Sequence, residues 1–488
     1  MTPAAHRAQL VVGCEAVAAD GHGEQTAVIN PADQTVIGYA PVAGAGLVDA
    51  AVTSATEAFR RWSARPAAQR AAHLEAIAAW IRSSERHLAH SLTLEQGKPL
   101  SEAASEVETA ARAFDFYAAE AVRVNGEIIP TESATLRSLV IRQPFGVVAA
   151  ITTWNYPLGL MAWKIAPALA AGCTVVAKPA EQTPLTVLDA ISGAVAAAGL
   201  PPGVLNSLNG DGAGAGRLLA GHPGVAKISF TGGTQTGRRL LELAARDIKS
   251  VTLELGGHSP MIVCADAPME LAVADGVKRS FRNAGQLCNS VNRIFVVRSV
   301  ADEFVTRFAA QAAKLVVGPG LGDPEPDLGP LSSAGALERV ERHVADARDH
   351  GAEVLTGGAR PPDERLRDGF YYLPTVVLGG PDLVMLREET FGPVAPILVV
   401  EDLDEAISRA NALDYGLVCY LYTRDLRTSI ESAERLEFGT VNVNNVGGGD
   451  VSFPYSGWKH SGLGVELGRA GLAEYLRTKN VRLEMGYR

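Results

Sequence analysis

Residues 147–178, VVAAITTWNYPLGLMAWKIAPALAAGCTVVAK, decide the fold of this chain. The segment begins with the apolar run Val147–Ile151 and ends with a second one, Thr174–Lys178, each as long as a typical buried strand. Between them, residues 166–172 have the composition of a helix. A strand, a helix and a strand in this order predict a right-handed βαβ unit with parallel strands.

Strand-like and helix-like segments keep alternating after this unit. One series ends near residue 254, and a second begins after Gly257. Each predicts an α/β unit, and the first has the doubly wound, Rossmann-type pattern of nucleotide-binding sheets. The expected helices are 184–199, 234–244, one that ends at Arg282, and 301–315; the expected strands are 204–206, 227–230, 261–264, 293–297, 375–377 and 397–400.

The segments before residue 147 have a different pattern of apolar and polar residues. Apolar residues recur at helical spacing in residues 47–88 and 101–122, which predicts amphipathic helices. Residues 123–148 change to an alternating, β-branched pattern, which predicts a protruding hairpin that pairs with another element or subunit. The glycine- and proline-rich interval 318–330 is expected to be a long loop.

Composition and charge limit the classes of partner. The chain has 488 residues, a hydrophobic fraction of 47% and a net charge of -10, from 44 basic and 54 acidic side chains. The acidic balance predicts neither a nucleic acid nor an anionic membrane as a partner. Residues 1–20 lack the apolar core of a secretory signal, and residues 143–163 are interrupted by prolines and polar residues, unlike a membrane-spanning helix.

The cysteines favour a reducing compartment. Their number is odd and their positions are scattered, which argues against a disulfide framework and against a zinc cluster. We therefore expect a cytoplasmic protein that holds no metal. Most free cysteines are small buried side chains, so a catalytic role must come from the context of the individual residue. The five cysteines are Cys14, Cys173, Cys264, Cys288 and Cys419.

One cysteine has such a context. Cys288 ends the run GQLC, and Glu254 lies in LELGG. A thiol that captures a carbonyl as a thioester needs an activated water to release it, and a carboxylate can activate that water. Gly285 permits close backbone approach next to the thiol. The pair predicts covalent chemistry at a carbonyl carbon.

An oxyanion site is predicted beside this thiol. Asn155 follows the first strand of the sheet, in TWNYP, at the carboxyl edge where doubly wound sheets bind ligands. A side-chain amide is a neutral donor that stabilises a developing oxyanion, and the backbone N–H of Cys288 is a second donor. Taken alone, an asparagine in a turn before a proline is an ordinary loop residue.

Two segments have the chemistry of a dinucleotide site. The turn FTGGT, residues 230–234, leads from a strand into a helix N-terminus whose amides can hold a pyrophosphate. In KPAE, Lys178 and Glu181 suit an adenosine ribose, and the carboxylate favours NAD over NADP because it would repel a 2′-phosphate. A solvated salt bridge is the alternative for these two residues. The glycines of residues 210–216 do not fit the GxGxxG register and are expected to form a loop and helix start.

Together these motifs resemble the NAD(P)-dependent aldehyde dehydrogenase superfamily. The resemblance rests on TWNYP (153–157), KPAE (178–181), FTGGT (230–234), LELGG (253–257), GQLC (285–288), EETFGP (388–393) and SGWKHSGLGVELG (456–468), in that order along nearly the whole chain. It implies an aldehyde dehydrogenase-like fold with three parts: a Rossmann-type NAD-binding domain (1–122 and 143–254), an α/β catalytic domain (255–445), and a small β oligomerisation domain with the C-terminal segment (123–142 and 446–488). Homodimers or homotetramers are implied as well.

The resemblance also implies a role for individual positions. Cys288 is expected to be the nucleophile, Glu254 the general base and Asn155 the oxyanion donor, with Lys164 and Glu466 relaying the proton from the base. The expected cofactor-binding residues are Thr153, Trp154, Lys178, Glu181, Gly232, Gly233, Leu255, Glu389 and Phe391. The expected substrate pocket consists of Tyr156, Leu160, Trp163, Arg282, Leu287, Asn289, Gly449 and Tyr455.

The implied reaction is the NAD-dependent oxidation of an aldehyde to a carboxylic acid. The Cys288 adduct gives up a hydride, and water activated by Glu254 hydrolyses the thioester. The aromatic collar of the pocket suits an apolar or aromatic aldehyde, whereas Arg282 and Asn289 favour a semialdehyde or a hydroxyaldehyde. A surface ion pair is the alternative for Arg282.

Two other functions are compatible with the same fold. In a CoA-acylating aldehyde dehydrogenase, a thiol replaces water in deacylation, and Glu254 in its motif speaks against that outcome. A catalytically silent structural or binding protein of the same fold would not need Cys288, Glu254 and Asn155, all of which are present.

Overall fold

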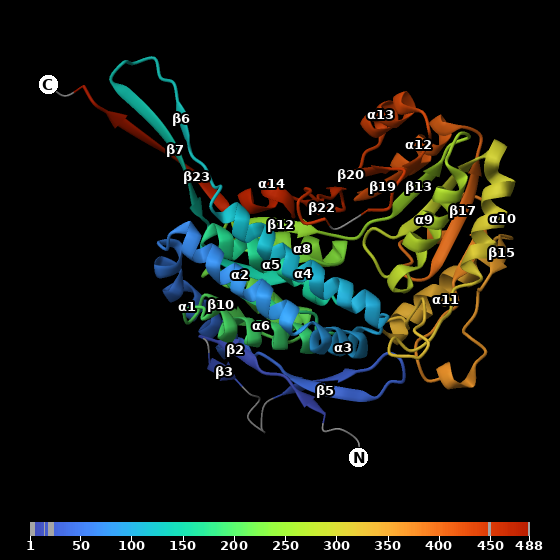
Figure 1. Cartoon of the computed structure of the whole chain (residues 1–488), viewed down its shortest axis with the longest axis horizontal. Helices are drawn as coiled ribbons and strands as arrows, with labels where there is room; N and C mark the ends of the chain where they lie inside the picture. The colour runs from blue at the N-terminus through green and yellow to red at the C-terminus, as the bar shows by residue number, and fades with distance from the viewer. Residues whose placement is uncertain (1–4, 14, 18–23, 448–449, 487–488) are drawn as a thin grey trace.

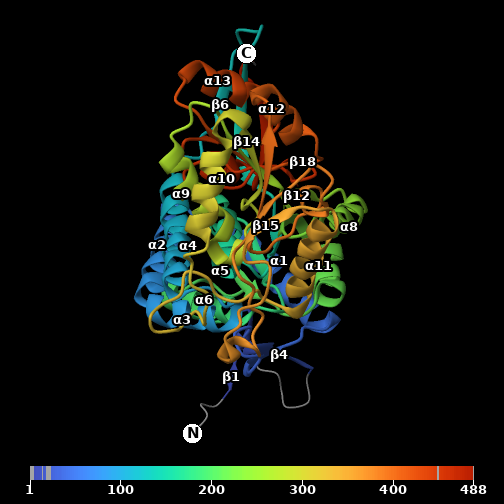
Figure 2. The same ribbon diagram turned by 90° about the vertical axis from the view of Figure 1, so that its right-hand side faces the viewer.

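The computed structural model describes residues 5–13, 15–17, 24–447 and 450–486. The chain forms two lobes, each built around one β-sheet, and a long arm that projects from the first lobe (Figure 1). A view turned by 90° shows the arm leaving the molecule on the side opposite strand β4 (Gln25–Ile29) (Figure 2). The predicted α/β architecture is confirmed.

The first sheet confirms the predicted doubly wound unit. Its central strands β8 (Val147–Ile151) and β9 (Thr174–Lys178) have the predicted bounds and pair in parallel. Both faces of β8 are buried, because α1 (Ala45–Ser63) covers one face and α5 (Pro157–Ala171) the other. The strand order is β10-β9-β8-β11-β12-β22, with β10 at Leu205–Ser207, β11 at Val225–Thr231, β12 at Ser250–Glu254 and β22 at Gly462–Leu463; only β22 is antiparallel.

The helix of the first βαβ unit begins earlier than predicted. The prediction of a helix over residues 166–172 is wrong at its start, because α5 begins at Pro157. The first free N–H groups of this helix, those of Leu158 and Gly159, donate to Oε1 of Glu106 at 3.0 and 3.1 Å. Glu106 lies on α4 (Leu100–Ala121), and this distant cap satisfies the helix start that the local sequence leaves open.

Helices surround the first sheet and its flanks. The amphipathic stretches predicted before residue 147 are confirmed as α1, α2 (Ala67–Ser83), α3 (Glu85–Gln96) and α4. After the sheet's second strand come α6 (Leu185–Ala198), a π-helical turn with α7 (Arg217–Gly221), and α8 (Thr234–Ala245). The turn and α7 confirm the expectation for residues 210–216. The sequence patterns did not reveal five N-terminal strands: β1 (His6–Arg7), β2 (Leu10–Val12), β3 (Glu15–Val17), β4 (Gln25–Ile29) and β5 (Val36–Pro41).

The second sheet has the order β15-β16-β17-β14-β13-β19-β20, and all its pairings are parallel except that of β15. Its helix α9 (Met269–Phe281) leads directly toward the predicted nucleophile. The strands are β13 (Ser259–Val263), β14 (Val291–Val297), β15 (Glu353–Thr356), β16 (Thr375–Leu378), β17 (Val394–Val400), β19 (Val418–Tyr422) and β20 (Thr440–Val443); the other helices are α10 (Ala301–Ala312), α11 (Ala334–Asp349), α12 (Leu403–Asn411) and α13 (Leu426–Arg435).

The projecting arm contains the predicted hairpin. Strands β6 (Glu127–Ile129) and β7 (Leu136–Pro144) pair in antiparallel fashion, and β23 (Leu476–Glu484) pairs with β7 along its whole length. The C-terminal strand β23 is therefore the third strand of the arm. Among the described residues, no helix is both long and apolar enough to cross a membrane.

Candidate active site

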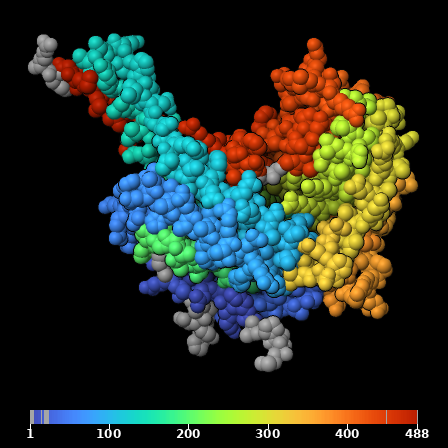
Figure 3. All heavy atoms as spheres, in the orientation of Figure 1, coloured from blue at the N-terminus to red at the C-terminus, as the bar shows by residue number. Residues whose placement is uncertain are grey.

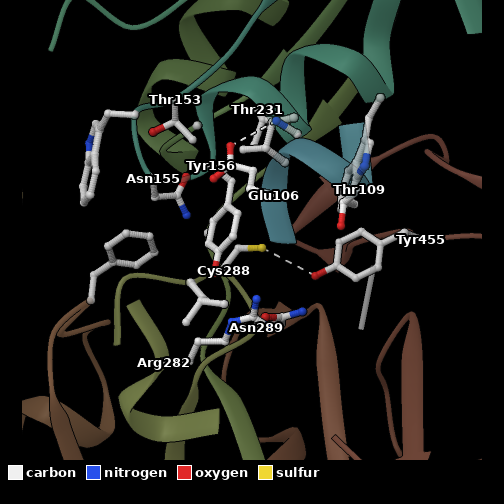
Figure 4. A pocket seen from close by; sticks show the side chains of 18 of the residues that line it. Glu106, Thr109, Thr153, Asn155, Tyr156, Thr231, Arg282, Cys288, Asn289 and Tyr455 are labelled. Carbon is white, nitrogen blue, oxygen red and sulfur yellow. Dashed lines mark hydrogen bonds between the residues drawn. The ribbon is translucent and has the colours of Figure 1, made fainter. Parts of the chain in front are cut away.

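A cavity of about 570 Å³ lies between the two lobes. The surface is visibly hollowed between the first lobe and the second (Figure 3), and the side chains that face the cavity come from both (Figure 4). The predicted residues that line it are Thr153, Trp154, Asn155, Tyr156, Leu160, Trp163, Gly232, Gly233, Leu255, Arg282, Leu287, Cys288, Asn289, Glu389, Phe391 and Tyr455. Sequence reasoning missed Glu106, Thr109, Arg112, Thr231, Gly256, Arg279, Arg339 and Asp450, among others.

Cys288 lies on a loop of unusual backbone conformation between α9 and β14. The residues Asn283, Ala284 and Gly285 all have positive φ, at 48°, 53° and 72°. A Cβ on Gly285 would stand 2.1 Å from the carbonyl oxygen of Gly392, so only glycine fits there. This close packing confirms the expected approach at Gly285 and fixes the loop that carries the thiol.

The Cys288 thiol faces the cavity. Its Sγ lies 3.5 Å from the hydroxyl of Tyr455, and the two side chains point toward one another (Figure 4). Burial raises the pKa of Cys288 to about 11, and the hydroxyl of Tyr455 opposes this shift. The thiol is therefore mostly protonated near neutral pH in this form of the protein.

Asn155 is held from both sides. Its Nδ2 donates to the backbone carbonyl of Gln286 at 3.0 Å, which uses one of its two N–H groups. Its own backbone carbonyl accepts a hydrogen bond from Nζ of Lys98 at 2.8 Å. Lys98 also forms an ion pair with Glu106, the cap of α5, and all three residues are buried. The amide is thus fixed in the same cavity as Cys288.

Glu254 ends β12 and is buried behind the cavity. Neither of its carboxylate oxygens accepts a hydrogen bond from the described residues. Burial, and then the negative charge of Glu466, raise the pKa of Glu254 well above its usual range. A raised pKa makes this carboxylate a stronger proton acceptor than an exposed one.

Lys164 and Glu466 form an ion pair next to this carboxylate, and both are fully shielded from solvent. The same oxygen of Glu466 accepts from Ser229 Oγ at 3.3 Å, and Ser229 in turn accepts from the hydroxyl of Tyr475 at 3.0 Å. The structure therefore brings Lys164 and Glu466 together as predicted, and it adds two hydroxyl groups that no sequence motif pointed to.

The groups that could hold a dinucleotide line the same cavity at the N-terminus of α8 and around Glu389. Gly233 caps α8, and the position of a Cβ on it has no protein atom within 4 Å, which leaves room at this helix N-terminus for a phosphate. Oε1 of Glu389 is buried without a hydrogen-bond partner among the described residues, and burial raises the pKa of this residue to about 8. The rings of Trp154 and Phe391 meet edge to face, 5.5 Å apart.

Lys178 and Glu181 do not line the cavity. Nζ of Lys178 is buried and donates to the carbonyls of Pro179 and Gly210 at 2.7 and 2.6 Å. Its distance to the Glu181 carboxylate is 4.0 Å, at the limit of an ion pair, and Glu181 is partly exposed. The lysine therefore braces the carboxyl edge of β9, while Glu181 remains accessible beside it.

The end of the cavity assigned to the substrate combines aromatic and cationic side chains. The rings of Trp163 and Tyr455 stand 6.1 Å apart. Arg282 lines the cavity, and its Nε lies 3.5 Å from Oε2 of Glu102, a residue of α4. The ion-pair alternative for Arg282 is thus realised, although the partner is largely buried and the site is not an exposed surface. Gly449, also predicted here, lies outside the described residues.

Comparison with known proteins agrees with this geometry. A model of the aldehyde dehydrogenase family matches residues 17–481. The chain is 41% identical to an NADP(+) succinate-semialdehyde dehydrogenase, GabD, of Escherichia coli over 459 residues, 94% of each chain. It is 40% identical to a 3-sulfolactaldehyde dehydrogenase of Pseudomonas putida, over 96% of this chain and 95% of that one. A solved structure of lactaldehyde dehydrogenase from Escherichia coli superposes with a TM-score of 0.95 at 36% identity, covering 98% of this chain and 100% of that chain.

Proposed function

The chain belongs to the aldehyde dehydrogenase family, and on this premise we propose that it oxidises a short, anionic aldehyde, with NAD preferred over NADP. It is an oxidoreductase that converts an aldehyde to a carboxylic acid with a nicotinamide cofactor. The observation that supports the substrate class is the group of arginines around the aromatic end of the cavity: Arg112, Arg279 and Arg282.

In this proposal Cys288 is the nucleophile. Its thiolate attacks the aldehyde carbon, and Asn155 Nδ2 together with the backbone N–H of Cys288 donates to the oxygen as negative charge develops there. A nicotinamide held by Glu389 and Phe391 would accept the hydride that leaves the former aldehyde carbon as its carbonyl re-forms. The protein is then left with an acyl group on Sγ as a thioester.

Glu254 is the proposed general base of the second half-reaction. Both of its oxygens lack a hydrogen-bond donor among the described residues, so they are able to accept from the attacking water. Lys164 and Glu466, which form an ion pair next to Glu254, would pass the proton on and so return Glu254 to the carboxylate that the next turnover requires. The products are a carboxylic acid and a free thiol.

Two features of the cofactor end fit a nicotinamide dinucleotide. The α8 N-terminus at Gly232 and Gly233 would hold the pyrophosphate, and the unpartnered oxygen of Glu389 would accept from a ribose hydroxyl. We propose NAD as the preferred form because the accessible Glu181 would repel a 2′-phosphate. The succinate-semialdehyde dehydrogenase relative is named for NADP(+), so the preference is tested by comparing kcat/KM for the two cofactors.

The anionic class is favoured over an apolar or aromatic aldehyde. Arg112, Arg279 and Arg282 place positive charge at the substrate end of the cavity. An apolar substrate would leave Arg279, which has no carboxylate partner among the described residues, without a counter-charge. Two relatives are named for aldehydes that carry a carboxylate or a sulfonate, which supports the same class. A hydroxyaldehyde is the second candidate, since Asn289 lines the cavity and one structural relative is a lactaldehyde dehydrogenase.

Each of the three parts of the chain would have its own function. Residues 1–122 and 143–254 would bind the cofactor, residues 255–445 carry the nucleophile, and the arm and C-terminal segment, 123–142 and 446–488, associate protomers into dimers or tetramers. We expect the enzyme to work in a reducing cytoplasm, because a free catalytic thiol must stay reduced.

An aldehyde panel tests this function. Reduction of NAD, followed by absorbance, should be fastest with succinate semialdehyde and slower with its neutral counterpart butyraldehyde. Adding CoA should not change the rate, because Glu254 directs deacylation to water; a rate that depends on CoA would instead support an acylating enzyme. No reduction with any aldehyde would contradict the proposal and favour a catalytically silent protein.

A further inference from the structure

Three arginines line the substrate end of the cavity, and two of them already have a carboxylate partner. Arg282 pairs with Glu102 at 3.5 Å, and Nη2 of Arg112 lies 3.9 Å from Oδ2 of Asp450. Arg279, on α9, has no carboxylate within ion-pair distance among the residues that the structure describes. The three guanidinium groups therefore differ in how much of their charge is already compensated.

Arg279 is also the most buried of the three, with 7% of its surface exposed. Its Nη1 donates to Oδ1 of Asn289 at 3.3 Å, and its Nη2 donates to the backbone carbonyl of Val446. Its guanidinium lies 5.9 Å from the centre of the Tyr420 ring. All three contacts are neutral. A buried cation without a counterion is unfavourable, so this site is best stabilised when an anion enters the cavity.

The contacts of Arg279 fix the cation close to the reacting thiol. Asn289 follows Cys288 directly, and its backbone carbonyl accepts from the hydroxyl of Tyr420 at 2.8 Å. Arg279 and Tyr420 thus hold the same residue from its side chain and its backbone. Burial raises the pKa of Cys288, and the positive charge of Arg279 opposes this change.

We propose that Arg279 binds the anionic group of the substrate and sets the enzyme's preference for anionic over neutral aldehydes. This inference rests on the proposed function and narrows it to one residue. The guanidinium has five N–H donors, of which the two contacts to Asn289 and Val446 use two, and a planar fork matches a carboxylate or a sulfonate. The preference would come from this group rather than from Arg282, whose charge Glu102 compensates.

The test compares succinate semialdehyde with butyraldehyde, which have the same number of carbons and differ in charge. In the wild-type enzyme, kcat/KM should favour the anionic aldehyde. In Arg279→Gln, which keeps a hydrogen-bonding amide, this preference should fall by about 100-fold, mainly through KM, as expected for the loss of a desolvated charge contact. Arg279→Lys should retain most of the preference, and Arg112→Gln should reduce it far less than Arg279→Gln.

The possible results distinguish a failure of the role proposed for Arg279 from a failure of the proposed aldehyde dehydrogenase function. If Arg279→Gln loses activity equally on both aldehydes, Arg279 only holds Asn289, and the inference is overturned while the function stands. If the wild-type enzyme shows no preference for the anion, both are overturned. A second measurement does not require turnover and so also applies to a very slow variant. It follows the alkylation of Cys288, which succinate should slow in the wild type and not in Arg279→Gln. Equal protection of the two proteins would count against the inference.

The same experiment is repeated with 3-sulfolactaldehyde, whose anionic group is a sulfonate. A loss of preference in Arg279→Gln for succinate semialdehyde alone would identify a carboxylate as the natural anion, and a loss for the sulfonate alone would identify a sulfonate. Either pattern supports Arg279 as the binding residue, and retention of both preferences would overturn it.

Discussion

Nζ of Lys98 donates a hydrogen bond of 2.8 Å to the backbone carbonyl of Asn155, and the lysine that does so is completely buried. The same ammonium pairs with Glu106, whose other oxygen caps α5 at Leu158 and Gly159. One buried ion pair therefore fixes both the proposed oxyanion donor and the start of the helix behind it. Burial lowers the pKa of Lys98, and the neighbouring carboxylate of Glu106 opposes that change.

Breaking this pair should damage both stability and catalysis. In Lys98→Met, Glu106 keeps a buried negative charge without its partner, which typically lowers the free energy of unfolding by about 3 kcal/mol or more. We expect a lower melting temperature by differential scanning fluorimetry and a lower kcat, because Asn155 loses its backbone anchor. Arg298→Ala is the matched control, since it breaks a fully exposed ion pair with Glu401. Equal melting temperatures for the two variants would contradict the role assigned to Lys98.

The reactivity of Cys288 should depend steeply on pH. Its pKa lies at about 11, so the uncharged thiol predominates below that value and the reactive thiolate increases about tenfold per pH unit. Alkylation of the cofactor-free protein by iodoacetamide should therefore accelerate continuously from pH 7 to 10, with the label located at Cys288 by peptide mass spectrometry. Cys288→Ser is the control for labelling elsewhere. A rate that levels off near pH 7 would show a thiolate already formed and would refute the raised pKa.

Replacing Glu254 with a neutral residue should shift the pH dependence of Cys288 alkylation. The carboxylate of Glu254 raises the pKa of Cys288, so Glu254→Gln removes a negative neighbour and favours the thiolate. At pH 9 we expect faster alkylation in Glu254→Gln than in the wild type. Slower alkylation in the variant would mean that Glu254 chiefly accepts the thiol proton in the free enzyme, contrary to the electrostatic argument.

The projecting arm offers a test of the proposed assembly. Ile128 on β6 is 73% exposed in the protomer, an apolar side chain that an associated second copy would cover. Ile128→Lys should lower the mass measured by light scattering after size exclusion, with no loss of folding. Ile248→Lys is the matched control, because Ile248 is 93% exposed and far along the chain from the arm. A wild-type monomer, or an unchanged mass in Ile128→Lys, would contradict association through the arm.

Local patterns predicted the parts of the fold in which every residue points into the core. All residues of β8 and β9 are buried, Gly146 precedes β8, and Gly172 and Pro179 flank β9. The start of α5 was not predictable, because its cap, Glu106, comes from another helix 52 residues earlier in the chain. The short N-terminal strands carry too few alternating residues to stand out.

In the active site, too, some residues could be predicted from the sequence and others could not. Cys288, Glu254 and Asn155 lie in motifs whose spacing and chemistry are visible in the sequence. The partners that hold other side chains of the site are distant in the chain: Lys98 for Asn155, Ser229 for Glu466 and Glu102 for Arg282. Arg279 was not predicted for a related reason, since an arginine on an amphipathic helix normally faces solvent. Only the packing of α9 against Asn289 and Tyr420 turns it toward the cavity.

A single-turnover experiment on Glu254→Gln tests the thioester mechanism. With excess aldehyde and NAD, the variant should form one NADH per active subunit and then stop, because Cys288 is acylated and no base activates water. Peptide mass spectrometry should find the acyl group on Cys288, and Cys288→Ala should form neither NADH nor adduct. Steady turnover by Glu254→Gln at the wild-type rate, or an active Cys288→Ala protein, would contradict the thioester mechanism.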